Sequence, residues 1–451
     1  MAQLQTTIPE TLGSLLEKKK FSSIKDIMST MNPADIAAVL EEMDPQQLAL
    51  LFRLLPKSLA AEAFVEMSAD AQETLIKAFT DRELKDIVDE LYMDDAVDLV
   101  EEMPSGIVKR ILRQTDPDTR RLINEMLKYP EDSAGSIMTT EFVDLSPSMS
   151  AQEAIDHIRE TGIDSETVNI CYVVGPSRVL LGAASIRSII LASGSVPVED
   201  FMERNVISVT TLEDQETVAQ MFAKYNFTAL PVVDTENRLV GIVTVDDAID
   251  VMQEEASEDI SKMAAVTPSD KPYLKRTVLE LWKSRVPWLM LLMISATFTG
   301  LIITHFEDAL STCLVLTSSI PMLMDTGGNS GSQSSVTIIR SLSLQEITPK
   351  NILAVVWKET RVAVLCGASL AAVGFVKFMV FDRVGLAVAA VISITLMSTV
   401  FVAKIVGCTL PIAAKKLGFD PAVMASPFIT TIVDALSLLI YFGMATLILH
   451  I

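Results

Sequence analysis

The 451-residue sequence predicts a multidomain, homodimeric protein: an all-α superhelical N-domain, a pair of α/β repeats, a connecting helix and a five-helix α transmembrane domain. Three observations predict this. Residues 1–260 carry 48 acids and 21 bases, whereas residues 261–451 carry 10 acids and 15 bases. Short helical phrases and then two similar α/β phrases fill the acidic part. Long apolar segments fill the last part and raise the mean hydropathy of the chain to +0.39.

The expected boundaries follow these changes in composition. They are 1–130 for the N-domain, 131–252 for the repeats (about 131–200 and 201–252), 253–276 for the connecting helix with its juxtamembrane segment, and 277–451 for the transmembrane domain. An acidic soluble half beside a mildly basic membrane half argues against nucleic-acid binding and suits divalent cations. The first twenty residues lack the apolar core of a signal peptide, so we expect the acidic half to stay in the cytosol.

The N-domain is predicted from phrases that recur roughly every twelve residues between Ala34 and Met103, among them ADIAAVLEEMD, QQLALLFRLLP and DAVDLVEEMP. Each phrase has apolar residues at i, i+3 and i+4 and closes at Pro, Asp or Ser, which is the pattern of a short amphipathic helix. Because one such helix cannot bury its apolar face alone, we expect the series to stack into a superhelix.

Two phrases about sixty residues apart follow Tyr129 and Pro130, and each reads strand, helix, strand, strand, helix. The order LPVVD…RLVGIVTVDDAI resembles a CBS-domain pair, over Gly135–Met252. This resemblance implies a regulatory module that dimerises and often binds adenine nucleotides, here ATP, or cations. Its candidate nucleotide-binding residues are Tyr172, Arg187 and Phe227, and core packing is the alternative role for the two aromatic residues.

The connecting helix continues the second repeat over Val245–Val266 and is rich in acids at helical spacing. Like charges at i and i+4 destabilise a helix by a few tenths of a kcal/mol per pair, so a counter-charge is expected. Divalent cations held between this helix and a facing acidic surface would supply it. The alternative is a solvated helix screened by salt. The acids are Asp246, Asp247, Asp250, Glu254, Glu255, Glu258 and Asp259.

Five apolar stretches reach or approach the roughly 20 residues that a helical membrane crossing needs. They are Val286–His305, Leu310–Met324 with the motif that follows it, Val362–Val380, Gly385–Leu410 and Ala425–Leu449. Lys and Arg gather before the first crossing, between the second and third, and between the fourth and fifth, while Glu307 and Asp308 lie on the alternate side. This predicts a cytoplasmic N-terminus and an outside C-terminus. Lys404 is expected to extend along its helix to the interface.

The second stretch runs into IPMLMDTGGNSGSQSSV (320–336), which carries Asp325, Asn329 and Gln333 at membrane depth. A further acid, Asp434, lies inside the last stretch. Polar groups persist at this depth only where protein or a water-filled path covers them, so the two segments predict an ion path. Two satisfied polar networks with no transport role are the alternative.

Five helices form a thin bundle, so a symmetric dimer with the path on its two-fold axis is favoured. Two Asp434 carboxylates would then face a divalent ion such as Mg²⁺, which keeps most of its water shell. Candidate oxygen donors to those waters are Asn329, Gln333, Thr430 and Thr431. Gly327, Gly328 and Gly331 would allow close helix approach or expose carbonyl groups.

At Pro321, Gly327, Gly328, Asn329, Gly331 and Gln333 the sequence spells P-x₅-G-G-N-x-G-x-Q, which resembles the signature of the MgtE family of magnesium channels. The resemblance covers almost the whole chain. It implies a homodimer of the plasma membrane whose cytosolic part binds Mg²⁺ and closes the pore when Mg²⁺ is plentiful, with the connecting helix at the inner mouth.

By this resemblance Asp434 corresponds to the acid of the pore ion site, and Asp94 and Asp98 correspond to N-domain acids that face the CBS pair. At position 226 the chain has Asn where an acid would provide another ligand. The remaining regulatory candidates are Asp247, Asp250, Glu255, Glu258 and Asp259, with Glu216 and Glu62 as weaker transfers.

Two other functions stay open at this point. A secondary carrier would couple divalent-cation movement to Na⁺ or H⁺. An intramembrane aspartyl protease would use Asp325-Thr326-Gly327 as a D-T-G motif, with Asp434 as the second carboxyl of the dyad. The acidic connecting helix and the CBS pair would have no purpose in a protease, so a non-enzymatic transport function is favoured.

Overall fold

The computed structural model describes residues 8–269, 271, 273–306, 314–424 and 426–449. The expected loop acids Glu307 and Asp308 lie outside these residues. The chain divides into two compact units, Met1–Met252 and Gln253–Ile451. The first unit holds the N-domain and the two α/β repeats, and the second holds the end of the connecting helix and the long apolar helices.

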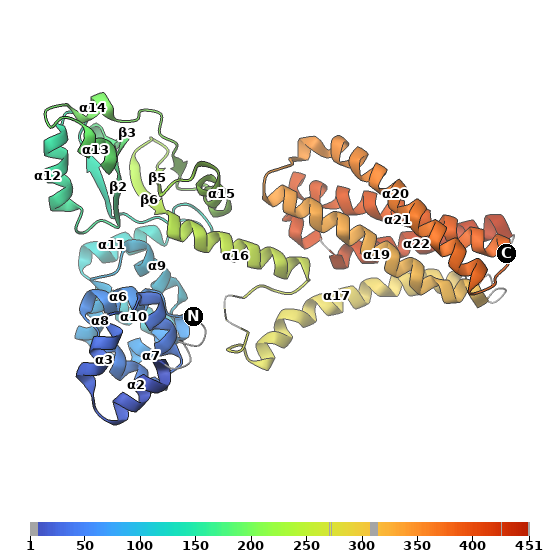
Figure 1. Ribbon diagram of the computed structural model, residues 1–451, viewed down its shortest axis with the longest axis horizontal. Coiled ribbons are helices and arrows are strands. Elements are labelled where there is room, and N and C mark those ends of the chain that lie inside the picture. Colours follow the sequence, from blue (N-terminus) through green and yellow to red (C-terminus); the bar gives the residue numbers. More distant parts are fainter. Residues whose placement is uncertain (1–7, 270, 272, 307–313, 425, 450–451) are drawn as a thin grey trace. The chain divides into compact units, whose positions relative to one another are not determined.

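The described part of the N-domain, from residue 8 onward, consists of ten short helices, which confirms the helical phrases in the sequence. Figure 1 shows them packed together. Alternate helices pack on one another, α4 on α6, α6 on α8 and α8 on α10, with α5 on α7 and α9 on α11 beside them. This is the expected helical stack. The helices are α2 (Ile8–Glu17), α3 (Phe21–Met28), α4 (Pro33–Glu41), α5 (Pro45–Phe52), α6 (Lys57–Val65), α7 (Ala69–Ala78), α8 (Asp81–Val88), α9 (Met93–Glu102), α10 (Ser105–Gln114) and α11 (Pro117–Met126).

Capping residues divide this region into short helices. The Asn32 side chain accepts a hydrogen bond from the Ala34 N–H at the start of α4, and Thr80 and Glu83 form a reciprocal capping box at the start of α8. Such caps satisfy backbone N–H groups that have no partner inside the helix. The apolar faces meet in one hydrophobic core, which continues into the second α/β repeat through residues such as Phe222 and Val232.

Each α/β repeat has the predicted order and folds as a three-stranded sheet, with a parallel pair followed by an antiparallel pair. The repeats meet where Tyr172 packs against Ala229, Leu239 and Ile242. The first repeat comprises β1 (Phe142–Leu145), α12 (Ala151–Thr161), β2 (Thr167–Val174), η1 (Pro176–Arg178), β3 (Leu180–Ser185) and α13 (Ile186–Leu191). After α14 (Val198–Phe201), the second comprises β4 (Val209–Thr210), α15 (Gln215–Tyr225), β5 (Ala229–Val233), β6 (Leu239–Thr244) and α16 (Val245–Met263).

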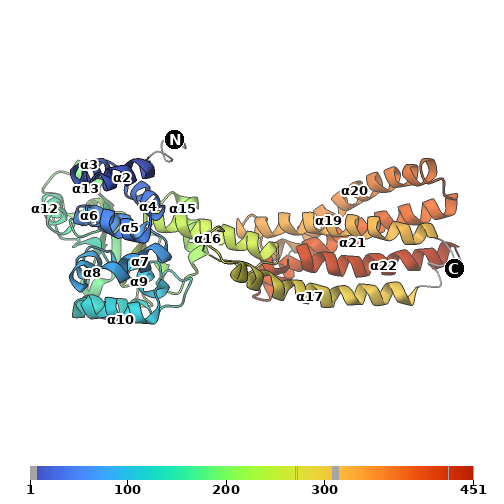
Figure 2. The same cartoon turned by 90° about the horizontal axis from the view of Figure 1, so that it is seen from below.

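Five long helices lie alongside one another in the second unit (Figure 2), with α21 packed against three of them. They are α17 (Val278–His305), α19 (Leu314–Ser343), α20 (Ile352–Val380), α21 (Leu386–Lys416) and α22 (Ser426–Leu449), with the short helices η2 (Pro349–Asn351) and η3 (Pro421–Met424) between them. Four helical segments of the described chain are long and apolar enough to cross a membrane: Val278–His305, Pro349–Val380, Leu386–Lys416 and Pro421–Leu449.

The structure corrects two expectations for these helices. Several helices begin earlier than the apolar stretches, α17 at Val278 and α20 at Ile352, because polar and charged residues extend them beyond their apolar part. The expectation that Lys404 extends to the interface is wrong. Its side chain is 5% exposed, and its Nζ donates a hydrogen bond to Ser334 Oγ at 3.3 Å.

Candidate metal centre

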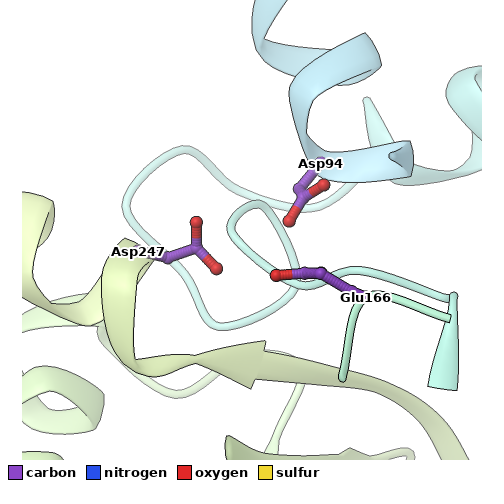
Figure 3. Close-up of side chains that lie close together, drawn as sticks. All are labelled: Asp94, Glu166 and Asp247. Atoms are coloured by element: carbon purple, nitrogen blue, oxygen red, sulfur yellow. The ribbon is translucent and has the colours of Figure 1, made fainter. Parts of the chain in front are cut away.

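Three carboxylates from distant parts of the first unit converge at one point (Figure 3). Asp94, Glu166 and Asp247 each offer an oxygen that lies within 4.8 Å of an oxygen from the other two. Asp94 is buried, and the other two side chains are half-buried. The three residues, called the carboxylate triad below, come from the N-domain, the first repeat and the second repeat.

Each member of the triad is positioned by local structure. Asp94 and Asp247 lie in the first turns of α9 and α16, where the helix dipole stabilises a negative charge. Asp94 Oδ1 accepts a hydrogen bond from the Asp95 N–H at 2.9 Å. Glu166 precedes β2, and its N–H donates to the Glu141 carbonyl oxygen at 3.0 Å. The triad therefore stands on two helix starts and one strand start.

The electrostatic environment of the triad is unfavourable to three bare carboxylates. Burial, followed by repulsion from Asp247, holds the pKa of Asp94 well above its ordinary value. Burial and the Asp247 charge raise the pKa of Glu166 to about 8. The same causes raise the pKa of neighbouring Asp95 to about 7. A cation at this point would compensate the charges.

The donor set fits a hard divalent cation. Carboxylate oxygens are the ligands that Mg²⁺ and Ca²⁺ prefer, whereas Zn²⁺ sites are most often built from Cys and His. The Oε2 atom of Glu166 is buried and has no hydrogen-bond partner among the described residues. A ligating cation would give this oxygen a partner, with water completing the coordination.

The structure brings two predicted regulatory residues, Asp94 and Asp247, into the triad. Asp98 lies one turn further along α9 and is exposed, and Asp250 is exposed one turn further along α16. Glu216 lies on α15, where its Oε1 accepts a hydrogen bond from Gln220 Nε2, and Glu62 is exposed on α6. These four residues do not belong to the triad.

The other predicted regulatory acids lie in the second unit, on the last turns of α16. Glu258 pairs with Lys262 at 2.7 Å, and Lys262 also pairs with Asp420 at 2.7 Å. Asp259 Oδ2 accepts a hydrogen bond from Ser343 Oγ at 3.1 Å. Glu255 is half-buried on the same helix. Contacts within the second unit therefore hold Glu258 and Asp259.

Glu166 is the functional candidate that sequence reasoning missed, together with its neighbour Asp95. Glu166 stands in the turn GIDSE before a strand, outside the acid-rich helices. An acid directly before a strand of a repeated α/β unit was the available signal. The periodicity of the sequence does not show which helix N-terminus lies close to this turn in the folded protein.

The predicted pore residues lie on α19 and α22. Asp325, Asn329 and Gln333 are four residues apart and all exposed, so they form a polar stripe along α19. Pro321 is exposed in the first third of this helix. Asp434 is half-buried on α22 and lies close enough to Asp325 for the two carboxylates to repel each other.

The glycines of the motif bring α19 against α22 and α21. A Cβ added to Gly327 would lie 2.9 Å from Val433 Cγ1, and one added to Gly328 would lie 3.0 Å from Thr430 Cγ2. Gly331 would meet Ile429 Cγ2 at 2.7 Å. These contacts lie within the five residues of α22 that precede Asp434. The hydroxyls of Thr430 and Thr431 both donate to the Pro427 carbonyl oxygen, which leaves their oxygens able to accept hydrogen bonds.

The three nucleotide candidates lie in different environments. Tyr172 is 1% exposed, and its ring meets Phe142 edge-on at 6.3 Å. The Tyr172 hydroxyl is buried without a hydrogen-bond partner among the described residues. Phe227 is half-buried and stacks on Tyr225 at 5.3 Å, and Arg187 is exposed on α13.

Family models match most of the chain. The model described as "Divalent cation transporter" (MgtE) matches residues 320–444, the MgtE intracellular N domain matches 31–132, and CBS domains match 134–195 and 198–254. The chain is 34% identical over 450 residues to the magnesium transporter MgtE of Thermus thermophilus, which covers 99% of this chain and 100% of the relative. It is 32% identical to the magnesium transporter MgtE of Bacillus subtilis, over 97% of this chain and 96% of the relative.

Solved structures resemble the first part of the chain. The crystal structure of the cytosolic domain of the Mg²⁺ channel MgtE in complex with ATP is 34% identical, with a TM-score of 0.52, and covers 54% of this chain and 100% of its own. The soluble part of a magnesium transporter is 28% identical, with a TM-score of 0.53, and covers 56% of this chain and 99% of its own.

Proposed function

Because the chain belongs to the MgtE family of divalent cation transporters, we propose that it is a Mg²⁺ channel that cytosolic Mg²⁺ closes. The carboxylate triad carries the regulatory part of this proposal. It joins the N-domain to both repeats through three acids that repel one another when no cation is bound.

The proposed gating mechanism is electrostatic. Without Mg²⁺, repulsion among Asp94, Glu166 and Asp247 favours separation of α9 from the start of α16. A bound Mg²⁺ attracts all three carboxylates and holds α9, β2 and α16 together. Helix α16 continues without a break from Asp247 to Met263, so a change at its first turn reaches its last turn. The two arrangements of this helix are the proposed open and closed states.

The proposed ion path follows the polar stripe of α19. Polar side chains exposed on a membrane helix need a partner or water, so we propose that a second copy of the chain covers Asp325, Asn329 and Gln333. Asp434, one from each copy, then provides the carboxylates for a hydrated Mg²⁺. Amide oxygens of the stripe and the hydroxyl oxygens of Thr430 and Thr431 accept hydrogen bonds from its water shell.

We further propose five crossings in the plasma membrane, with α19 joining the four apolar segments. The basic residues before and within the start of α17, around the junction of α19 and α20, and in the last turn of α21 favour a cytoplasmic N-terminus and an outside C-terminus. This orientation places the carboxylate triad in the cytosol. A membrane potential supplies roughly 4.6 kcal/mol per 100 mV for an entering divalent ion.

ATP is the proposed second regulatory ligand. The ATP complex of the 34% identical cytosolic domain supports nucleotide binding by the corresponding part of this chain. We propose that Phe227 and Arg187 contact the nucleotide and that Tyr172, which lies in the core between the repeats, supports the wall of the cleft.

Single-channel recording with Mg²⁺ as the charge carrier tests the proposal. We expect discrete openings that become rarer as cytosolic Mg²⁺ rises, and loss of these currents in Asp434→Ala. Asp94→Asn should shift closure to higher Mg²⁺, whereas the control Asp35→Asn, at an exposed position of α4, should not. Vesicle flux without unitary currents that depends on a Na⁺ or H⁺ gradient would instead establish a carrier.

A further inference from the structure

A charged network lies inside the second unit, beside the predicted pore motif, since Ser334 directly follows Gln333 on α19. Lys404 on α21 is 5% exposed, and its Nζ donates to Ser334 Oγ on α19 at 3.3 Å. Ser334 is also buried, and its hydroxyl donates to Glu359 Oε2 on α20 at 2.7 Å. The Ser334 hydroxyl therefore accepts a hydrogen bond from the Lys404 ammonium group and donates one to the Glu359 carboxylate, so it acts as acceptor and donor at once.

Stability alone does not account for this network. Buried ion pairs pay a desolvation cost, and well-packed apolar residues of similar size are often as stable or more stable. Ionisable residues inside membrane helices are rare and most often mark function. The network joins three helices at one level, and its middle residue belongs to the helix that carries the polar stripe.

The position of the network connects it to the ion path. Gly331 lies one turn from Ser334, and a Cβ added to Gly407 would lie 2.3 Å from the Gly331 carbonyl oxygen. A Cβ on Gly331 would lie 3.2 Å from the Ala403 carbonyl oxygen. Residues 403 and 407 lie on either side of Lys404 on α21, so a close approach of α19 to α21 lies beside the charged network.

We propose that Lys404 and Glu359, bridged by Ser334, are positioning residues for Mg²⁺ transport. They set the place of α19 along α21 and α20, and thereby the place of the polar stripe relative to Asp434. This inference rests on the proposed transport function. Contacts among glycine, alanine and β-branched residues allow helices to slide with little directional preference, whereas two charge-assisted hydrogen bonds to one hydroxyl fix a single register.

The test compares a charged network with a neutral one. In Lys404→Met/Glu359→Gln no unpaired charge is left, so we expect a melting temperature close to that of the wild type. We also expect the Mg²⁺ concentration for half-maximal flux in proteoliposomes to change at least fivefold. Ser334→Ala should change the half-saturating Mg²⁺ concentration in the same direction as the double variant. Ser334→Thr, which keeps the hydroxyl, should have a half-saturating concentration within twofold of the wild type.

Lys377→Met is the matched control, because Lys377 is exposed on α20 and pairs with Asp382 at 2.6 Å. It should leave the half-saturating concentration unchanged. A neutral double variant with wild-type flux and half-saturation would show that the network only supports the fold, and would overturn the inference. Absence of Mg²⁺ flux in the wild type would instead overturn the transport proposal, so the two failures are distinguishable.

Discussion

The Thr244 hydroxyl donates a hydrogen bond of 2.6 Å to Asp247 Oδ2, and the Thr244 N–H approaches the same oxygen at 3.3 Å. Thr244 is the last residue of β6, and Asp247 lies in the first turn of α16. The end of a strand thus orients a carboxylate of the triad. Such second-layer hydrogen bonds hold metal ligands in place before the cation arrives.

Thr244→Val should weaken cation binding at the triad. It removes the hydroxyl at nearly constant volume, and a hydrogen bond to a charged group contributes roughly 1.5–3 kcal/mol. We expect the Mg²⁺ concentration that gives half of the maximal thermal stabilisation of the purified protein to rise about tenfold. Thr244→Ser, which keeps the hydroxyl, serves as the control. An unchanged Mg²⁺ titration in the valine variant would contradict this role.

Glu166→Gln should separate the charge repulsion within the triad from the stabilisation that Mg²⁺ binding provides. Above pH 8, where Glu166 is ionised, removing its charge relieves repulsion, so the variant without Mg²⁺ should melt at a higher temperature than the wild type. The stabilisation produced by added Mg²⁺ should become smaller, because one ligand has lost its charge. Glu160→Gln, at an exposed position of α12, should change neither quantity. Differential scanning fluorimetry with and without Mg²⁺ measures both.

The triad predicts a pH dependence of stability. Burial raises the pKa of Glu166 from 4.5 to about 8 and that of Asp95 from 3.8 to about 7. Between the ordinary and the raised pKa values, the two carboxyls of the folded protein hold protons that the unfolded chain releases. The free energy of unfolding without Mg²⁺ should therefore fall as the pH rises from about 4 to 8. Mg²⁺ should oppose this fall, and its stabilising effect should grow with pH. Melting curves at pH 5.5 and 8 check both statements, and a Mg²⁺ effect independent of pH would contradict them.

Gly407→Ala should damage the membrane unit. Its Cβ would lie 2.3 Å from a backbone oxygen of α19, which cannot yield as a flexible side chain does. Overpacking of this kind costs about 1–3 kcal/mol, or it separates the two helices. Gly443→Ala is the matched control, since no atom lies within 4 Å of its added Cβ. Size-exclusion chromatography and melting in detergent should distinguish the two variants.

The ion pair between Lys262 and Asp420 should bias gating. It ties the last turn of α16 to Asp420, the residue before η3, at 2.7 Å within the second unit. Asp420→Asn removes this tie, and we expect a higher open probability at a fixed, intermediate Mg²⁺ concentration. Asp382→Asn breaks a comparable pair with Lys377 and should leave the open probability unchanged. An equal open probability in the wild type and Asp420→Asn would contradict this role.

The periodic elements of the fold could be predicted from the sequence, whereas contacts between individual residues that are distant in the sequence could not. The spacing of apolar residues and the capping residues predicted the short N-domain helices, and the repeated strand order predicted the two sheets. Asp247 was a candidate because it lies in the acid-rich connecting helix, and Asp94 was a candidate because of the resemblance to the MgtE family. Glu166 was missed because its partners are far away in the sequence. Lys404 was misplaced because one residue in an apolar segment does not reveal the hydroxyl that receives it.

The unbroken length of α16 has a mechanical consequence. From Asp247 to Met263 the helix measures about 24 Å at 1.5 Å per residue. A rigid rod of this length converts a tilt of about 5° at one end into a displacement of about 2 Å at the other. In the proposed gating mechanism, a small change in carboxylate separation at the triad would thus become a shift of about 2 Å at Met263.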